Sequence, residues 1–280
     1  MSDAAGDIKQ NIRSISYGGG VQSTALIVLA TQGIIEADVA LMANTGDDSE
    51  MPETLSYVRD IIQPWANERG FPVHILDPIK HGKKTTLYQE ITNEGSRRDL
   101  IPVFGEKGNP MGRACTADFK IRVVHRWLRQ NGATKVNKAT VLLGISTDEI
   151  ERAGRGKNVS IEIREYPLLK LGLDRTACAQ VIQDAGLPVP PKSACFFCPF
   201  HSETVWRELR RDHPDLFAKA QHLEDFIQNR KSESNMRQVY LTRKGALNNR
   251  RLSDQIAEAG PTLFDSEIGT DGCDSGFCWT

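Results

Sequence analysis

The sequence predicts an α/β fold in which helices flank a mostly parallel sheet. Between residues 12 and 145, short apolar segments alternate with longer segments that have the apolar spacing of helices. Strands that alternate with helices are joined by right-handed crossovers, which places helices on both faces of a parallel sheet. Glycine or polar residues follow three of the apolar segments, and ligands of such sheets bind at the carboxyl ends of the strands.

Each element of this half has its own pattern. In the first strand, serine alternates with isoleucine and tyrosine before a glycine ends it, and the later strands are short apolar runs. The expected strands are 14–17, 37–44, 72–77 and 139–145. The expected helices are an apolar one from residue 21, one over 52–70 that is interrupted near Pro64, and a basic one over 119–132.

The second half of the chain changes character from about residue 193. Two helices are expected over 202–231, separated near His213-Pro214, and then a short strand or hairpin over 238–248 and a small helix from residue 252. The last residues are rich in Gly, Asp and Ser, and we expect a mobile tail. The predicted organisation is an α/β domain over 11–200, a helical extension over 201–260, and a flexible tail with cysteines over 261–280.

The segment "SYGGGVQST" joins the first strand to the first helix through Gly18, Gly19 and Gly20. The N–H groups that begin a helix are unpaired and lie at the positive end of its dipole, so such a junction favours phosphate. A tight turn that needs positive φ at one glycine is the alternative. A P-loop would have Lys where Gln22 stands, and a dinucleotide-binding loop would have Gly where Ser23 stands.

Composition describes an ordinary globular chain. The sequence of 280 residues has a formal net charge of -1 and 39% hydrophobic residues, so no overall basicity points to nucleic acid. No signal peptide and no apolar run of ~18 residues is evident, and we expect a cytoplasmic protein without a membrane partner. In that reducing compartment, cysteines more often bind metal or perform redox chemistry. The six cysteines are Cys115, Cys178, Cys195, Cys198, Cys273 and Cys278, of which Cys178 has the pattern of a core residue.

Several motifs resemble one family. The glycine segment is similar to the PP-loop of ATP pyrophosphatases and adenylyl-sulfate reductases, with Gly18 in place of a serine and Gln22 in place of an aspartate. The segment 44–58 resembles phosphoadenylyl-sulfate (PAPS) reductases in its Thr-Gly, Pro-Glu-Thr and Tyr. Further resemblances lie around Cys115 and Lys120, in "GISTDEIERAG" and in "SACFFCPF". Together they cover 12–200.

The resemblance implies an adenine nucleotide α-hydrolase-like, Rossmann-like fold of the PP-loop superfamily. It also implies ATP or PAPS as the substrate nucleotide, and it leaves room for Mg²⁺. The residues expected to bind the nucleotide are Tyr17, Gly18, Gly19, Gly20, Gln22, Ser23, Thr24, Asn44, Thr45, Gly46, Asp47, Gly144 and Arg152.

The cysteines suggest a metal centre. Cys195 and Cys198 have the Cys-x-x-Cys spacing, which lets two thiolates bind one metal ion or cluster. With Cys115, the resemblance implies a [4Fe-4S] iron-sulfur cluster. Zinc held by these three thiolates and His201 is the alternative, because the spacing suits zinc equally well.

The predicted reaction is ATP-dependent sulfur transfer that forms AMP and pyrophosphate. The alternatives are reduction of PAPS or adenylyl sulfate by a thiol of the tail, and a nucleotide-binding module without catalysis. Cys273, Cys278 and Lys120 are the expected catalytic residues, the cysteines because accessible thiolates are the nucleophiles that such a step requires. The expected partners are an adenine nucleotide, a sulfur donor or thiol reductant, and a nucleic acid or a sulfur-carrier protein. The oligomeric state is not predicted.

Overall fold

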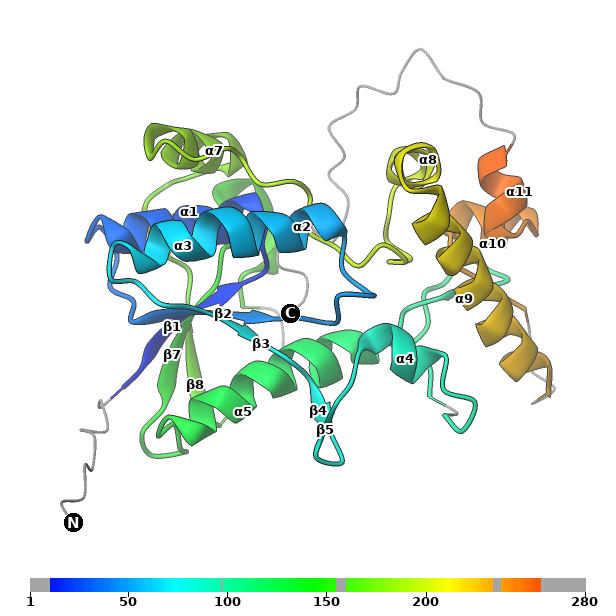
Figure 1. The fold of residues 1–280 in the computed structure, drawn as a ribbon, viewed down its shortest axis with the longest axis horizontal. Helices are drawn as coiled ribbons and strands as arrows, with labels where there is room; N and C mark the ends of the chain where they lie inside the picture. Colours follow the sequence, from blue (N-terminus) through cyan, green and yellow to red (C-terminus); the bar gives the residue numbers. More distant parts are fainter. Residues whose placement is uncertain (1–10, 97, 155–159, 234–237, 258–280) are drawn as a thin grey trace.

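The computed structural model describes residues 11–96, 98–154, 160–233 and 238–257. In these residues, parallel strands form a five-stranded central sheet in the order β3-β2-β1-β7-β8 (Figure 1). The predicted α/β architecture with a parallel sheet is therefore confirmed. The strands are β1 (Arg13–Tyr17), β2 (Val39–Ala43), β3 (Val73–Leu76), β7 (Ala139–Leu142) and β8 (Glu162–Glu165).

Helices cover both faces of the sheet (Figure 1). On one face, α1 packs with α3 and α7 over Ile15 and Met42; on the other, α5 packs over Val39 and Leu41. Successive side chains of a strand point to opposite faces, so each strand contributes to both cores. The helices of this part are α1 (Val21–Thr31), α2 (Pro52–Ser56), α3 (Gln63–Asn67), α5 (Arg122–Gln130), α6 (Pro167–Lys170) and α7 (Arg175–Asp184).

The helix predicted over 52–70 runs without an interruption at Pro64. A π-helical segment η1 (Tyr57–Ile62) joins α2 to α3, and Pro64 falls in the first turn of α3, where its missing N–H is tolerated. A second π-helical segment, η2 (Thr116–Ile121), precedes α5, and a 3₁₀ segment, η3 (Thr147–Arg152), follows β7.

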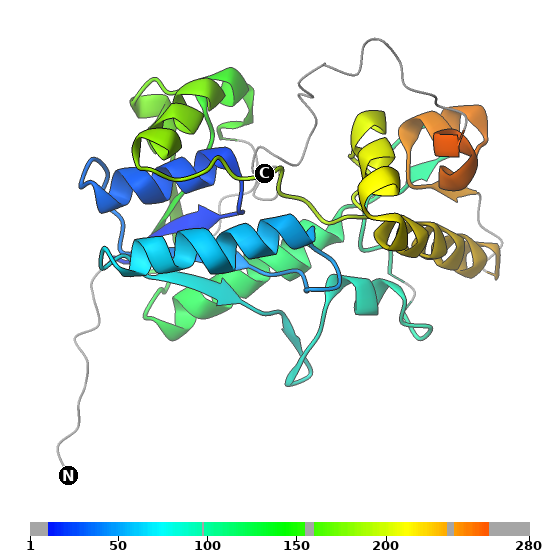
Figure 2. The ribbon, with the colours of Figure 1, turned by 45° about the horizontal axis from the view of Figure 1, so that its top comes forward.

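The helical extension shares its core with an earlier segment of the chain. Strand β9 (Val239–Tyr240) pairs antiparallel with β6 (Phe104–Gly105), and one apolar cluster joins residues of 87–119 to residues of 195–256. Figure 2 shows the extension beside the α/β part. Its helices are α8 (Glu203–Asp212), α9 (Pro214–Glu233), α10 (Arg243–Asn248) and α11 (Leu252–Ala257); the remaining elements are α4 (Leu87–Ile91) and the hairpin β4 (Ile79–Lys80) and β5 (Lys83–Lys84). None of the described helices has the length and apolar character that a membrane span requires.

The strand or hairpin predicted over 238–248 is only partly right. The strand ends at Tyr240, and α10 follows because the Thr242 hydroxyl accepts a hydrogen bond from Gly245 N and caps a helix. The predicted tail over 261–280 lies outside the described residues. The boundary predicted at residue 200 stays a prediction, although the shared core makes 87–119 a packing partner of the extension.

Candidate functional site

The glycine loop turns from β1 into α1. Gly19 has a φ of +81°, which L side chains rarely adopt, and a Cβ there would lie 2.8 Å from Thr54 Cγ2. Gly20 is the N-cap of α1, so the unpaired N–H groups and the positive end of the helix dipole face the loop. The Ser23 hydroxyl accepts a hydrogen bond from Gly18 N at 3.3 Å. The loop thus has the local geometry that an anion site requires.

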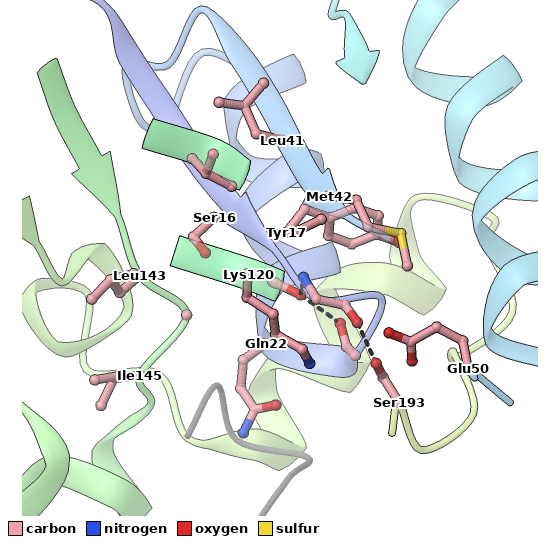
Figure 3. Close-up of a pocket in the computed structure, with 16 residues that line it drawn as sticks. Ser16, Tyr17, Gln22, Leu41, Met42, Glu50, Lys120, Leu143, Ile145 and Ser193 are labelled. Atoms are coloured by element: carbon pink, nitrogen blue, oxygen red, sulfur yellow. Dashed lines mark hydrogen bonds between the residues drawn. The ribbon is translucent and has the colours of Figure 1, made fainter. Parts of the chain in front are cut away.

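A cavity opens beside this loop, at the carboxyl ends of β1, β2 and β7 (Figure 3). Several residues that the sequence predicts to bind the nucleotide line this cavity: Tyr17, Gly18, Gly20, Gln22, Ser23 and Gly144. The other predicted residues lie outside its described lining: Gly19, Thr24, Asn44, Thr45, Gly46, Asp47 and Arg152. For both groups of residues, the assignment to the nucleotide stays a prediction.

Gly144 brings the end of β7 close to the first turn of α1. A Cβ at Gly144 would lie 3.0 Å from the backbone nitrogen of Ser23 and 3.2 Å from Gln22 Cβ, so a larger residue would push the loops apart. Gln22 is buried, and its Nε2 donates to Ser146 Oγ at 3.4 Å. Its Oε1 has no hydrogen-bond partner among the described residues, so a ligand of this cavity has one buried acceptor available.

The residues outside the lining have structural partners. Asn44 Nδ2 donates to Asp47 Oδ1 at 2.9 Å, and Asn44 Oδ1 accepts from Gly46 N at 3.0 Å. Arg59 lies 2.7 Å from Asp47 and, with the Asn44 amide, holds the pKa of that carboxyl below its usual range. These contacts shape the loop after β2.

Two other predicted residues are buried in hydrogen-bonded positions. Thr24 Oγ1 donates to the Tyr17 hydroxyl at 3.4 Å, and burial raises the pKa of Tyr17. Arg152 is buried in η3 and lies 2.5 Å from Glu149. Both residues hold neighbouring segments in place.

Cys195 lies where the loop that carries Cys195 and Cys198 meets the loop after β2. The Thr45 hydroxyl donates to Glu50 Oε1 at 2.7 Å and lies 3.3 Å from Cys195 Sγ. Burial, and next the nearby Glu50 carboxylate, raise the pKa of the Cys195 thiol well above its ordinary value. In the absence of a metal, this residue is therefore a neutral thiol at pH 7.

A second, mostly apolar cavity is lined by Cys115, Cys195 and Cys198. Lys120, on η2, lines both this cavity and the cavity at the glycine loop. Thiols on one apolar wall are a suitable donor set for zinc or an iron-sulfur cluster. Within the described ranges, however, no three His, Cys, Asp or Glu side chains converge closely enough to hold a metal ion. The donor chemistry fits a metal and the described spacing does not, so the metal ligands stay predictions.

His201 holds the cysteine loop together in this structure. Its Nε2 donates to the backbone oxygen of Cys195 at 2.9 Å, and its ring stands edge-on to Trp206 with centroids 5.2 Å apart. Burial lowers the pKa of His201 to about 4, so the ring is neutral at pH 7. Its predicted role as a zinc ligand would compete with this hydrogen bond. Cys178 is fully buried in the core, as expected, and Cys273 and Cys278 lie outside the described residues.

The sequence did not single out Glu50 and Ser193, although both line the cavity at the glycine loop. The Ser193 hydroxyl donates to the backbone oxygen of Gly18 (Figure 3). Glu50 lies within the segment 44–58 and Ser193 begins "SACFFCPF", but neither is one of the residues that carry the resemblance. Glu50 could have been noticed because a glutamate lies between the Thr-Gly and Pro-Glu-Thr strings.

No family model matches the chain, and no curated protein matches its sequence. Among solved structures, the chain is similar to the U34-tRNA thiolase NcsA from Methanococcus maripaludis with its [4Fe-4S] cluster. The two chains are 15% identical, the similarity covers 79% of this chain and 73% of the other, and the TM-score is 0.38. So loose a superposition says nothing about shared residues or a shared activity.

Proposed function

We propose that the chain is an enzyme of the PP-loop type that activates an acceptor with ATP and then transfers sulfur to it. The observation that carries this proposal is the position of Lys120, whose side chain lines both the glycine-loop cavity and the cavity of the cysteines. A phosphate bound to the glycine loop and a sulfur held by Cys115, Cys195 or Cys198 would then lie in adjacent cavities, with Lys120 between them. That arrangement suits a reaction in which an adenylate forms and sulfur displaces it.

The first step would take place at the N-terminus of α1. The backbone N–H groups of the glycine loop and the helix dipole would hold the phosphates of ATP. An acceptor oxygen attacks the α-phosphorus, the bond from this phosphorus to the bridging oxygen breaks, and pyrophosphate leaves. The ammonium of Lys120 would offset the negative charge that develops on the phosphates. The acceptor carbon now carries AMP, a good leaving group.

The second step would use the cysteine cavity. A sulfide sulfur attacks the adenylated carbon, the carbon–oxygen bond breaks, and AMP leaves with both electrons of that bond. Cys115, Cys195 and Cys198 are the proposed holders of the sulfur, and the apolar walls of their cavity would keep water from the activated carbon. A bound [4Fe-4S] cluster would supply an iron site for sulfur, and zinc is the alternative metal.

We propose a nucleic acid as the acceptor class. Arg98 and Arg122 are 59% and 63% exposed, and both pair with the buried Asp118 of η2, the segment that also carries Lys120. Two cations against one carboxylate leave a net positive charge on this surface. Exposed cations of this kind attract a polyanion.

Reduction of PAPS is the second candidate. The observation that favours it is the Thr45 hydroxyl beside the Cys195 sulfur, because Thr45 belongs to the string that resembles PAPS reductases. That reaction needs no cleavage of ATP. It would instead need a thiol that attacks sulfur in the substrate.

The deciding experiment measures pyrophosphate release from ATP by the full chain with Mg²⁺, sulfide and either RNA or DNA. Lys120→Ala should reduce the rate by about 100-fold, because it removes a charge that acts in the transition state. Lys83→Ala is the matched control, since Lys83 is an exposed lysine of the β4–β5 hairpin and should leave the rate unchanged. If wild-type protein releases no pyrophosphate with either nucleic acid, the proposed sulfur transfer is wrong.

A further inference from the structure

The helical extension contains a cavity that the proposed function does not use. Its volume is about 370 Å³, and it lies where the segment after Cys198 meets α8, α10 and α11. Cavities that hold small organic ligands have volumes of roughly 300 to 1,000 Å³. This one can therefore accommodate a single small organic group.

Aromatic side chains form much of its wall. Phe104, Phe200 and Trp206 line the cavity, and the rings of Phe104 and Phe200 meet edge to face with centroids 6.1 Å apart. Trp206 is fully buried. Aromatic side chains in the wall of a cavity favour an aromatic ligand, which can pack against them.

Two buried polar atoms of the lining residues have no hydrogen-bond partner in the described part of the chain. They are the indole nitrogen Nε1 of Trp206, which is a donor, and the side-chain oxygen Oε1 of Gln255, which is an acceptor. Gln255 is 6% exposed and Trp206 is 0% exposed. Because buried polar groups are nearly always hydrogen-bonded, a ligand with both an acceptor and a donor would satisfy this pair.

The rim of the cavity is positively charged. Arg243 and Lys244 line it beside Glu203. The carboxylate of Glu203 lies 2.7 Å from Lys244 and 2.6 Å from Arg207, so two cations pair with this one carboxylate. Arg243 is exposed to solvent. An anionic group such as a phosphate would be attracted to this rim.

The cavity adjoins the cysteines. Pro199 and Phe200 line both this cavity and the one formed by Cys115, Cys195 and Cys198. Lys120 in turn lines the cysteine cavity and the glycine-loop cavity. The three cavities therefore form a row, with the cysteines in the middle.

We propose that the cavity of the extension binds one nucleotide unit, a base with its phosphate, which flanks the reactive position of the nucleic acid. The base carries donors and acceptors at its edge for Trp206 and Gln255 and flat faces for the aromatic wall, and the phosphate pairs with Arg243. The strand runs from this cavity past the cysteines towards the glycine loop, where its reactive oxygen meets ATP. The inference rests on the proposed function in taking nucleic acid as the acceptor.

The test is equilibrium binding, by fluorescence anisotropy and without ATP, of labelled single-stranded RNA and DNA of about eight nucleotides. Trp206→Phe keeps an aromatic side chain but replaces the indole with a smaller phenyl ring and removes the N–H, and it should raise the dissociation constant about tenfold. Arg243→Ala should flatten the plot of log affinity against log salt by about 0.7, the value for one phosphate contact on a single strand. Arg211→Ala is the matched control, because Arg211 is exposed on α8 and pairs with Asp212 instead of lining the cavity.

Two results would overturn the inference: no binding of either strand, or binding that neither Trp206→Phe nor Arg243→Ala changes. Arg243 is exposed, so its variant remains informative even if Trp206→Phe fails to fold. Uridine monophosphate distinguishes the source of the nucleotide. If it binds and Arg243→Ala weakens it while the strands do not bind, the cavity holds a free nucleotide, and the assignment to nucleic acid is wrong.

Failure of the inference can be separated from failure of the proposed function. If the strands bind through Arg243 but the wild-type protein releases no pyrophosphate from ATP, the cavity binds nucleic acid and the proposed sulfur transfer is wrong. If pyrophosphate release depends on nucleic acid but substitutions at Arg243 and Trp206 do not change binding, the proposed sulfur transfer is supported and the assignment of this cavity is wrong.

Discussion

The hydroxyl of Thr45 lies 3.3 Å from the sulfur of Cys195, although 150 positions separate the two residues in the sequence. Around this contact, Glu50 and Cys195 form an isolated antiparallel bridge, in which Met51 N donates to Ala194 O at 3.1 Å and Phe196 N to Ser49 O at 3.0 Å. The loop after β2 and the cysteine loop are thus one hydrogen-bonded unit. A change in one loop should therefore alter the other.

Thr45→Val tests this unit, because valine keeps the shape of the side chain and removes the hydroxyl. Glu50 is 3% exposed and would lose its hydrogen bond from Thr45. We expect the free energy of unfolding to fall by about 1 to 3 kcal/mol, the cost of leaving a buried polar group without its partner. Ser56→Ala, at an exposed position of α2, is the control and should change it by less than about 0.5 kcal/mol. Equal stability of the two variants in urea would contradict this reading of the contact.

The glycine loop offers a matched pair of substitutions. Gly19→Val places a side chain at a φ of +81° and against Thr54, whereas a Cβ at Gly18 would meet nothing within 4 Å. If phosphates bind to the backbone of this loop, Gly19→Val should weaken ATP binding at least about tenfold, and Gly18→Ala should weaken it much less. Calorimetric titration with ATP measures both, and the thermal midpoint of each variant shows whether it is folded. A folded Gly19→Val protein with wild-type affinity for ATP would show that the phosphates do not bind to this loop.

The sequence was sufficient for the elements whose local pattern agrees with their place in the fold. Apolar runs at 37–44 and 139–145 predicted the buried strands β2 and β7, and the glycine triplet predicted the turn into α1. Strand β8 was missed because its sequence, Glu-Ile-Arg-Glu, has the composition of a surface segment. Glu162 is nevertheless buried there, because it pairs with His125 at 2.6 Å and with Arg164 at 2.8 Å. Such a strand depends on partners distant in sequence, which no local pattern reveals.

The same limit applies to the candidate site. Residues in motifs, such as Gly18, Ser23 and Gly144, were predicted, since their roles follow from a strand end or a helix start. Glu50 and Ser193 line the same cavity only because the cysteine loop pairs with the loop after β2. That pairing is tertiary, and the sequence contains no spacing that encodes it.

His201 should make the stability of the metal-free protein depend on pH. The folded protein holds its pKa at about 4, below the ~6.5 of an unfolded histidine, so the unfolded chain takes up the proton first as the pH falls. The stabilisation is complete above about pH 6.5 and is lost progressively down to about pH 4, by roughly 3 kcal/mol in all. His201→Gln keeps a donor for the Cys195 carbonyl and does not titrate. Urea unfolding of chelator-treated protein should therefore show a smaller loss between about pH 7 and about pH 4 in the variant. Equal losses in both proteins would contradict the prediction.

Metal analysis tests the cysteine cavity. Anaerobically purified protein should be brown and contain about four irons per chain if a [4Fe-4S] cluster is bound. Cys195→Ser should abolish the metal and the colour, because it removes a thiol from the shared wall. Cys178→Ala is the control: Cys178 lies in the core, where burial raises its thiol pKa to about 12, and its loss should leave the metal content unchanged. A colourless protein with one zinc would establish zinc as the metal. A protein that contains neither iron nor zinc would rule out both metal sites.

The last prediction separates the two candidate reactions. Activity of wild type, Cys273→Ser, Cys278→Ser and Cys195→Ser is to be measured with ATP and a sulfide source, and separately with PAPS and a thiol reductant. If sulfur transfer depends on the cysteine cavity, pyrophosphate release and product formation from ATP should survive both tail substitutions.

Cys195→Ser should abolish product formation, because that residue joins the cysteine cavity to the loop after β2. If the protein is instead a reductase, a tail thiolate attacks sulfur in the bound substrate, since the thiolate is the nucleophilic form of cysteine. One of the two tail variants should then lose turnover while it keeps nucleotide affinity and metal content. Turnover only with PAPS, and only with an intact tail cysteine, would replace sulfur transfer by PAPS reduction as the function of this chain.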